Sequence, residues 1–294
     1  MKPAAFKYHR PVTMDEALKI LAEHGSQAKV IAGGQSLAPM MNMRVANPQH
    51  VVDINDLSEF NFIRSDLGAV CVGPLARHHQ VAQSPLVNSV CPLLAYSAST
   101  IGHYVIRQRG TLAGSVAHAD PAAQIPLVAI TLGATISLLS LKGVREIGAN
   151  DFFIGPMTTV IGDGEIISKV AFPVVGDRAG WAFEMFNRRH GDYAIVAIAV
   201  HLALDAHGRI GVFEIGIGGL GGLPLSLTSP MRELAMGISP DDAGIERLVL
   251  GIDRLIQPED SQQISSEYKR ELCSALAREA IRKAARRAQE GEGQ

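Results

Sequence analysis

The chain has 294 residues, of which 47% are hydrophobic and 19% charged, and its formal net charge is -2 at pH 7. This length and composition indicate a compact globular protein with two domains, or one domain divided into subdomains. The nearly balanced charge gives no reason to expect nucleic acid or an anionic membrane as a partner.

The three cysteines, Cys71, Cys91 and Cys273, are far apart and odd in number. Because no CxxC pair or zinc-type Cys/His spacing occurs, we expect neither a metal cage nor an iron–sulfur cluster in this chain, and reduced thiols in the cytoplasm. The N-terminal residues lack the apolar core of an export signal. The most apolar segment, residues 193–204, ends at Asp205 and is too short to span a membrane.

In the first part of the chain, Thr13 and Glu16 form a capping-box pattern, and the helix that follows is expected to end at Gly25. Ser36 is the expected N-cap of a second helix. These signals predict a small α/β unit that ends near residues 55–58. Its expected elements are strands at 6–8, 29–31 and 50–54 and helices at 14–24 and 37–44.

The middle of the chain is predicted to alternate strands with apolar helices. Pro121 suits the first turn of a helix, and residues 173–176 mark a second boundary. The expected elements are strands at 69–72, 134–139 and 166–172, helices at 85–99 and 122–132, and an irregular segment at 101–110.

Beyond residue 177 the pattern predicts an antiparallel meander followed by helices. Residues 206–208 give a hairpin signal between the last two strands. The expected elements are strands at 181–187, 194–204 and 209–217, and helices that begin at Pro230, Asp241 and Ser261.

Two glycine-containing turns carry the strongest functional signal. Residues 30–36 (VIAGGQS) run from a strand through two glycines into a helix, and residues 110–115 (GTLAGS) form a similar turn. Glycine has no Cβ, so its amide can approach an anion closely, and the amides that open a helix favour negative charge. Two such turns suit the two phosphates of a pyrophosphate.

Other motifs have simpler explanations. Residues 216–221 fit GxGxxG, but Pro224 and the hairpin context argue against a dinucleotide fold, so we expect close packing there. Ser115, His118 and Asp120 lack the spacing of a hydrolase triad.

Three further features are read as structural or left open. We expect His78 and His79 at a solvated helix start, and His201 in the core or at a sheet edge. The basic run 282–287 is read as the solvated face of a C-terminal helix. Residues 187–193 (NRRHGDY) are compatible with either a group that stacks on a planar ligand or a charged hairpin with a tyrosine anchor.

Five segments together resemble a known family. They are AGGQS at 32–36, RQRGTLAGS at 107–115, HADPAA at 118–123, DFFIGP at 151–156 and RRHGDYA at 188–194. In order and spacing they resemble the FAD-binding medium subunit of molybdenum hydroxylases, the xanthine dehydrogenase and aerobic carbon monoxide dehydrogenase family. The resemblance implies an α+β protein with the PCMH or vanillyl-alcohol-oxidase type of FAD-binding fold. It implies FAD-binding subdomains at 1–56 and 57–177, and a C-terminal domain at 178–294 with a three-stranded antiparallel sheet and helices.

The resemblance also implies the FAD-binding residues. The family binds FAD through two pyrophosphate loops, residues around the flavin ring, a ribityl or pyrophosphate contact and a tyrosine that covers the flavin. The corresponding positions here are Ala32, Gly33, Gly34, Gln35, Ser36, Ile101, Gly102, Thr111, Leu112, Ala113, Gly114, Ser115, Asp120, Gln124, Ile167 and Tyr193. Two positions depart from the family pattern. Ala113 replaces a glycine, and its Cβ would hinder a positive φ, while Gln124 replaces an acidic residue.

The function implied is electron transfer through FAD within a heterotrimer. The partners would be a molybdopterin-containing large subunit and a small subunit with 2Fe-2S clusters, assembled as a dimer of heterotrimers. The chain itself is expected to have no catalytic acid–base residue and no metal ligand. Two alternatives stay open: a free-standing FAD-dependent dehydrogenase of the same fold, and a scaffold subunit that has lost FAD, for which Ala113 is the best support.

Overall fold

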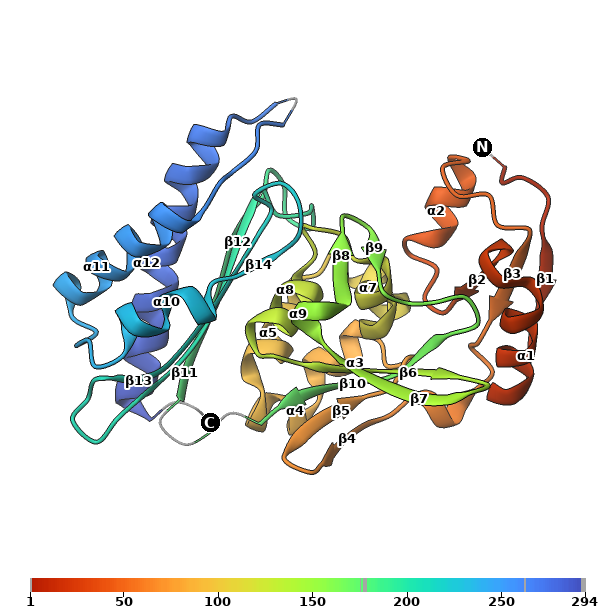
Figure 1. The fold of residues 1–294 in the computed structure, drawn as a ribbon, viewed down its shortest axis with the longest axis horizontal. Helices are drawn as coiled ribbons and strands as arrows, with labels where there is room; N and C mark the ends of the chain where they lie inside the picture. The colour runs from red at the N-terminus through yellow and green to blue at the C-terminus, as the bar shows by residue number, and fades with distance from the viewer. Residues whose placement is uncertain (1, 175, 177–178, 262, 292–294) are drawn as a thin grey trace.

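The computed structural model describes residues 2–174, 176, 179–261 and 263–291. The chain forms three masses in a row, with the N-terminal elements at one end, the central subdomain between, and the C-terminal sheet and helices at the other end (Figure 1). The boundary expected at residue 177 lies outside the described residues.

The N-terminal mass is the predicted α/β unit. Its three strands are parallel in the order β1-β3-β2, and α1 packs its buried residues Met14, Ala17, Leu18 and Leu21 against them. Thr13 caps α1, because its side chain accepts a hydrogen bond from the Glu16 amide. The elements are β1 (Lys7–His9), α1 (Met14–His24), η1 (Gly25–Gln27), β2 (Ala28–Ile31), α2 (Leu37–Asn42), β3 (His50–Asp53) and η2 (Ser58–Phe60).

The central mass is built on a five-stranded antiparallel sheet in the order β4-β5-β10-β6-β7. Its strands are β4 (Ile63–Asp66), β5 (Ala69–Val72), β6 (Thr135–Ser140), β7 (Gly143–Gly148) and β10 (Ile166–Pro173), with a separate pair β8 (Phe153–Gly155) and β9 (Thr158–Thr159). Its helices are α3 (His78–Gln83), α4 (Pro85–Val90), α5 (Pro92–Ser99), α6 (Tyr104–Arg109), α7 (Leu112–His118), α8 (Gln124–Thr131) and α9 (Ala149–Phe152).

Three secondary-structure predictions for this region were wrong in detail. The single helix expected at 85–99 is broken at Cys91, whose backbone is not helical, and α5 begins with Pro92. The segment expected to be irregular contains α6. The helix after Pro121 begins only at Gln124, because the Asp120 carboxylate accepts from the Ala122 amide and forms a turn before it.

The C-terminal mass contains the predicted meander and three helices. Strands β11 (Ala179–Phe186), β12 (Val196–Leu204) and β13 (Ile210–Gly218) pair antiparallel in sequence order. The sheet has a fourth strand that was not expected, the two-residue β14 (Leu225–Ser226) beside β13. The helices are α10 (Thr228–Ala235), α11 (Asp242–Leu255) and α12 (Ser266–Glu290). No helix among the described residues is both long and apolar enough to cross a bilayer.

Strand β12 faces two cores, which explains its long apolar run. Ala197 and Ala199 belong to the cluster of the central mass, whereas Val196, Ile198 and Val200 belong to the cluster beneath α10, α11 and α12. Alternate residues of a strand point to opposite faces, so a strand buried on both faces is apolar throughout. The C-terminal sheet therefore lies between its own helices and α5 and α8 of the central mass.

Glycines allow close packing on both faces of this sheet. A Cβ on Gly216 would lie 2.2 Å from Thr131 Oγ1 on α8, and one on Gly180 would lie 1.8 Å from the Ala284 carbonyl oxygen on α12. The packing interpretation of the GxGxxG segment is thus confirmed. The interpretation of residues 282–287 as a solvated face is confirmed for Arg282 and Arg286, which are exposed, but not for the other two cations. Lys283 pairs with Glu184, and the Arg287 guanidinium lies 3.8 Å from the Trp181 ring centroid.

Candidate cofactor site

A cavity of about 580 Å³ lies between the N-terminal and central masses. Its walls come from the end of β2, the start of α2, the first turn of α7, the start of α8, the segment from β9 to β10, and Tyr193. The volume is within the range of cofactor and small-molecule sites. Both predicted glycine turns open onto this cavity.

The first turn presents amides with no internal partner. Among the described residues, no acceptor binds the backbone N–H groups of residues 33–36, and Gly34 has a φ of 68°. A run of free amides around a residue of positive φ forms a concave surface that binds anions. The prediction that Ser36 caps α2 was wrong. Ser36 does precede α2, but its backbone is already helical and its hydroxyl makes no capping bond, so the side chain occupies none of the free amides of the turn.

The second turn is the beginning of α7. Thr111 Oγ1 accepts a hydrogen bond from the Gly114 amide at 3.1 Å, while the amides of Thr111 and Ala113 have no acceptor among the described residues. A Cβ on Gly114 would lie 2.7 Å from Thr111 Oγ1, so glycine permits this cap. Ala113 is absent from the described residues with positive φ and packs its side chain in the core. The strain expected from its Cβ does not arise.

The two turns are in backbone contact. A Cβ on Gly33 would lie 2.3 Å from the Arg109 carbonyl oxygen and 2.7 Å from Gly110 Cα. Only a residue without a side chain permits the approach. Gly33 therefore places the first set of free amides beside the chain that leads into the second set, and both can contact one ligand.

Arg77 and Asn55 join the two turns through hydrogen bonds. The Arg77 guanidinium donates to the Arg109 carbonyl oxygen and to Asn55 Oδ1, each at 2.6 Å, and Asn55 Nδ2 donates to the Ala32 carbonyl oxygen at 2.8 Å. Burial lowers the pKa of Arg77, with a smaller effect from the charge of Arg109. Because guanidinium pKa values lie so far above neutrality, Arg77 stays charged. We call this set the Arg77–Asn55 brace.

His78 lies behind the second turn and is buried, contrary to the prediction of a solvated position. Its Nδ1 has no hydrogen-bond partner among the described residues, and its ring also lines the cavity. Burial, and then the charge of Arg107, lower its pKa to about 4. The imidazole is therefore neutral at physiological pH.

Most of the predicted site residues line this one cavity. They are Ala32, Gly33, Gly34, Gln35, Ser36, Ile101, Thr111, Ala113, Gly114, Ser115, Gln124, Ile167 and Tyr193. Three others lie outside its lining. Leu112 is fully buried in the central core, Gly102 packs against Ile106, and Asp120 holds the turn before α8. Among the described residues no hydrogen bond joins Ser115, His118 and Asp120, which agrees with the absence of a hydrolase triad.

Part of the cavity lining is apolar. Ile167 lines the cavity and is buried, and Gln124 directs its amide to Met185 Sδ at 3.8 Å. Burial, and then the negative charge of Asp120, raise the pKa of Tyr193, so its phenol is neutral. Tyr193 lines the cavity and is 55% exposed, so its ring is available to stack on a planar group. This location favours the ligand-facing interpretation of residues 187–193 over the charged hairpin.

Sequence reasoning missed Asn55, Arg77 and His78. Residues 55–58 attracted notice only as a polar boundary, although Asn55 follows β3 at the same sheet edge as the first turn. Arg77 is 32 residues from its carbonyl acceptor at Arg109. No local pattern signals a contact over that distance.

The lining of the cavity therefore combines glycine-dependent anion contacts with apolar residues and an aromatic ring. These lining residues suit a dinucleotide-like cofactor with a pyrophosphate and a planar ring. The α+β fold and this site together define a flavin-binding protein.

Comparison with known families gives the class. Residues 4–175 match the family described as the FAD binding domain in molybdopterin dehydrogenase, and residues 181–284 match the CO dehydrogenase flavoprotein C-terminal domain. The chain belongs to this family of molybdenum hydroxylase flavoproteins. Its cofactor is FAD, and it is an oxidoreductase subunit.

Individual relatives match over nearly the whole chain. The glyceraldehyde dehydrogenase medium chain of Sulfolobus acidocaldarius is 34% identical, with 97% of this chain and 100% of the relative covered. The caffeine dehydrogenase subunit beta of a Pseudomonas species is 33% identical, with 98% and 97% covered. A solved structure of quinoline 2-oxidoreductase from Pseudomonas putida superposes with a TM-score of 0.92 at 32% identity, covering 98% of this chain and 99% of that chain.

Proposed function

We propose that this chain is the electron-transfer subunit of a heterotrimeric molybdenum hydroxylase. In this proposal electrons come from 2Fe-2S clusters on a small partner subunit and leave through FAD to an external acceptor. A molybdopterin-containing large subunit performs the hydroxylation, and the complex is a cytoplasmic dimer of heterotrimers. The observation that carries the proposal is the backbone contact of the two amide-rich turns at Gly33 and Arg109.

The bound flavin would supply the redox chemistry, and the protein supplies position and electrostatics. The free amides of residues 33–36 and the first turn of α7 would bind the pyrophosphate. The Arg77–Asn55 brace holds the two turns at a fixed separation. Ile167 and Tyr193 would contact the ring and exclude water from one side of it.

The assignment of residues to FAD is testable with a charge at Gly34. Asp and Asn are nearly equal in size, and both tolerate the positive φ of this position. A Cβ there would contact the Ile31 side chain at 3.3 Å, which a flexible aliphatic group can absorb. Gly34→Asp and Gly34→Asn therefore differ mainly in a negative charge beside the proposed phosphate.

We expect Gly34→Asp to purify without FAD and Gly34→Asn to retain it with weakened affinity. Flavin absorbance per chain and a titration of the apoprotein with FAD give the two quantities. Equal FAD affinity in the two variants would remove the first turn from the phosphate site.

The free-standing dehydrogenase remains the competing function. Co-purification of the native chain with iron and molybdenum supports the heterotrimer, whereas a yellow single chain that turns over substrate alone supports the alternative. The scaffold alternative loses its main argument, because Ala113 lies in α7 without backbone strain.

The domain division at 1–56, 57–177 and 178–294 also stands as part of this proposal. Three apolar clusters support it, although each boundary is crossed by shared packing. Leu75 joins the N-terminal cluster, and alternate residues of β12 join the central one.

A further inference from the structure

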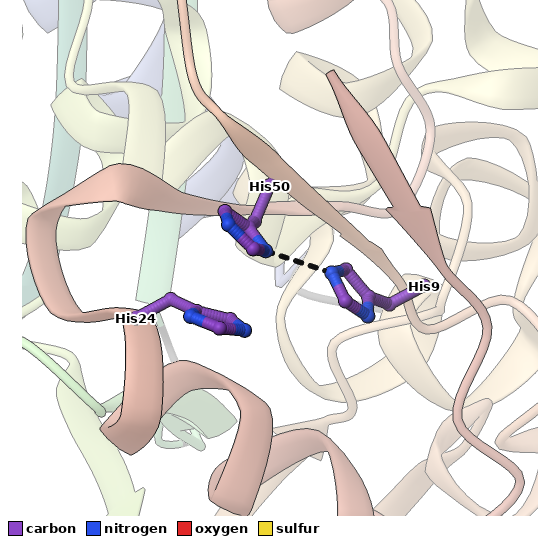
Figure 2. A group of neighbouring side chains, drawn as sticks. All are labelled: His9, His24 and His50. Atoms are coloured by element: carbon purple, nitrogen blue, oxygen red, sulfur yellow. Dashed lines mark hydrogen bonds between the residues drawn. The ribbon is translucent and has the colours of Figure 1, made fainter.

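Three histidines from separate elements meet in the N-terminal mass, on residues that the FAD site does not use. His9 ends β1, His24 ends α1 and His50 begins β3 (Figure 2). One ring nitrogen of each lies within 4.8 Å of one from each of the others. His50 is buried, and His9 and His24 are partly buried.

We propose that His9, His24 and His50 form a binding site for a divalent transition-metal ion of the Zn²⁺ class. Imidazole is the preferred nitrogen ligand of such ions, and three histidines with one further ligand complete a tetrahedral site. The proposal departs from the expectation that the chain holds no metal ligand. That expectation came from local spacing, and these residues are separated by 15 and 26 positions.

The existing distances are close to those that a metal needs. His9 Nε2 and His50 Nδ1 are 2.9 Å apart and share one hydrogen bond. Two nitrogens bound to a tetrahedral ion at about 2.0 Å are roughly 3.3 Å apart, so this pair must open by a few tenths of an ångström. The shared N–H proton would move to the other nitrogen of its ring, which leaves a free lone pair on each nitrogen, and a small tilt of the two rings directs these lone pairs at the ion.

The third ligand requires a rotation. The His24 ring stacks on His50 with a centroid separation of 3.6 Å and 27° between the planes. A metal lies in the plane of each imidazole that binds it, so the His24 ring must turn out of this stack. Its side chain retains 22% exposure at the C-terminal end of α1, which leaves room for that movement.

Neighbouring charges have opposing effects. Glu23 Oε1 lies 3.8 Å from His24 Nε2 and could supply the fourth ligand or a balancing charge, whereas Lys7 repels a cation. The metal would fasten β1, the end of α1 and β3 together, in the subdomain that carries the first FAD turn.

The test uses the full-length FAD-containing protein, freed of metal with a chelator and titrated with Zn²⁺ alone. We expect one equivalent to bind in calorimetry and in metal analysis, and the melting temperature to rise with Zn²⁺. His24→Gln and His9→Gln each remove one ligand and should weaken binding at least tenfold. Their FAD content should stay at the wild-type value, which separates this result from any failure of the FAD proposal.

His207→Gln is the matched control, because His207 is exposed in the turn between β12 and β13. It should bind Zn²⁺ like the wild type. X-ray absorption of the Zn²⁺ complex should show at least three nitrogen ligands. The proposal is overturned if the wild type shows no saturable single site, if both ligand variants bind as tightly as the wild type, or if His207→Gln weakens binding equally.

Discussion

Replacing Gly33 with alanine should separate the two turns that form the FAD site. The new Cβ would lie 2.3 Å from the Arg109 carbonyl oxygen and 2.7 Å from Gly110 Cα, and both are backbone atoms that cannot rotate away. An ordinary contact needs about 3.5 Å, so one turn must move by roughly 1 Å. That movement would also stretch the 2.6 Å bond from Arg77 to the same oxygen.

Overpacking of this kind costs about 1 to 3 kcal/mol. If this cost is borne by the FAD-bound state and not by the apoprotein, the affinity for FAD should drop by a factor of roughly 5 to 150. The assay is a fluorescence titration of the apoprotein with FAD, combined with urea unfolding of the apoprotein to measure any general loss of stability. Gly222→Ala is the control, because its Cβ would have no neighbour within 4 Å and its φ is not positive.

The reasoning is refuted if Gly33→Ala binds FAD with the affinity of the wild type and of Gly222→Ala. It is also refuted if the free energy of unfolding of the apoprotein falls by the full 1 to 3 kcal/mol expected for overpacking while the affinity for FAD is unchanged. In either case the contact between the turns does not determine the binding geometry.

Three further predictions concern other parts of the chain. Arg77→Lys keeps a charge but loses the two separate nitrogens with which the guanidinium reaches the Arg109 carbonyl oxygen and Asn55, so FAD affinity should fall. In a double-mutant cycle with Asn55→Ala the losses should be non-additive, and additive losses would contradict the brace. The pKa of His78 is about 4 in the folded protein and about 6.5 in the unfolded chain, so the unfolded chain binds the proton first as pH falls. The free energy of unfolding should therefore decrease by about 2 kcal/mol between pH 7.5 and 5. Urea unfolding of His78→Leu should lack this part of the pH dependence. Gly216→Ala should destabilise the protein by about 1 to 3 kcal/mol in urea unfolding, whereas Gly211→Ala, whose Cβ has only ordinary contacts at 3.6 Å, should change it far less.

The strands and the glycine turns could be predicted because their signals are local. The strand expected at 69–72 coincides with β5, and the meander of the last domain was found from alternating apolar runs and a hairpin signal. Such patterns lie within a few residues of the chain and follow from strand and turn geometry. The five family segments then linked both turns to one cofactor.

Contacts between distant segments could not be predicted in the same way. The burial of His78 depends on the approach of Gly110, and one side of the basic run of α12 packs on β11 because Gly180 and Trp181 lie against Ala284 and Arg287. The Ser36 cap failed for a different reason. Its residue type favours capping, but its own backbone is already helical, so the hydroxyl is not in a capping position.

Strand β12 makes the last domain inseparable from the FAD-binding part. Every residue of α8 is buried, and its outer side is covered by β12 and β13. A chain truncated near residue 177 would expose Leu127 and Thr131 to water and should aggregate rather than fold. Thermal denaturation of the whole protein should accordingly show a single cooperative transition, in which flavin release and loss of the C-terminal helices coincide.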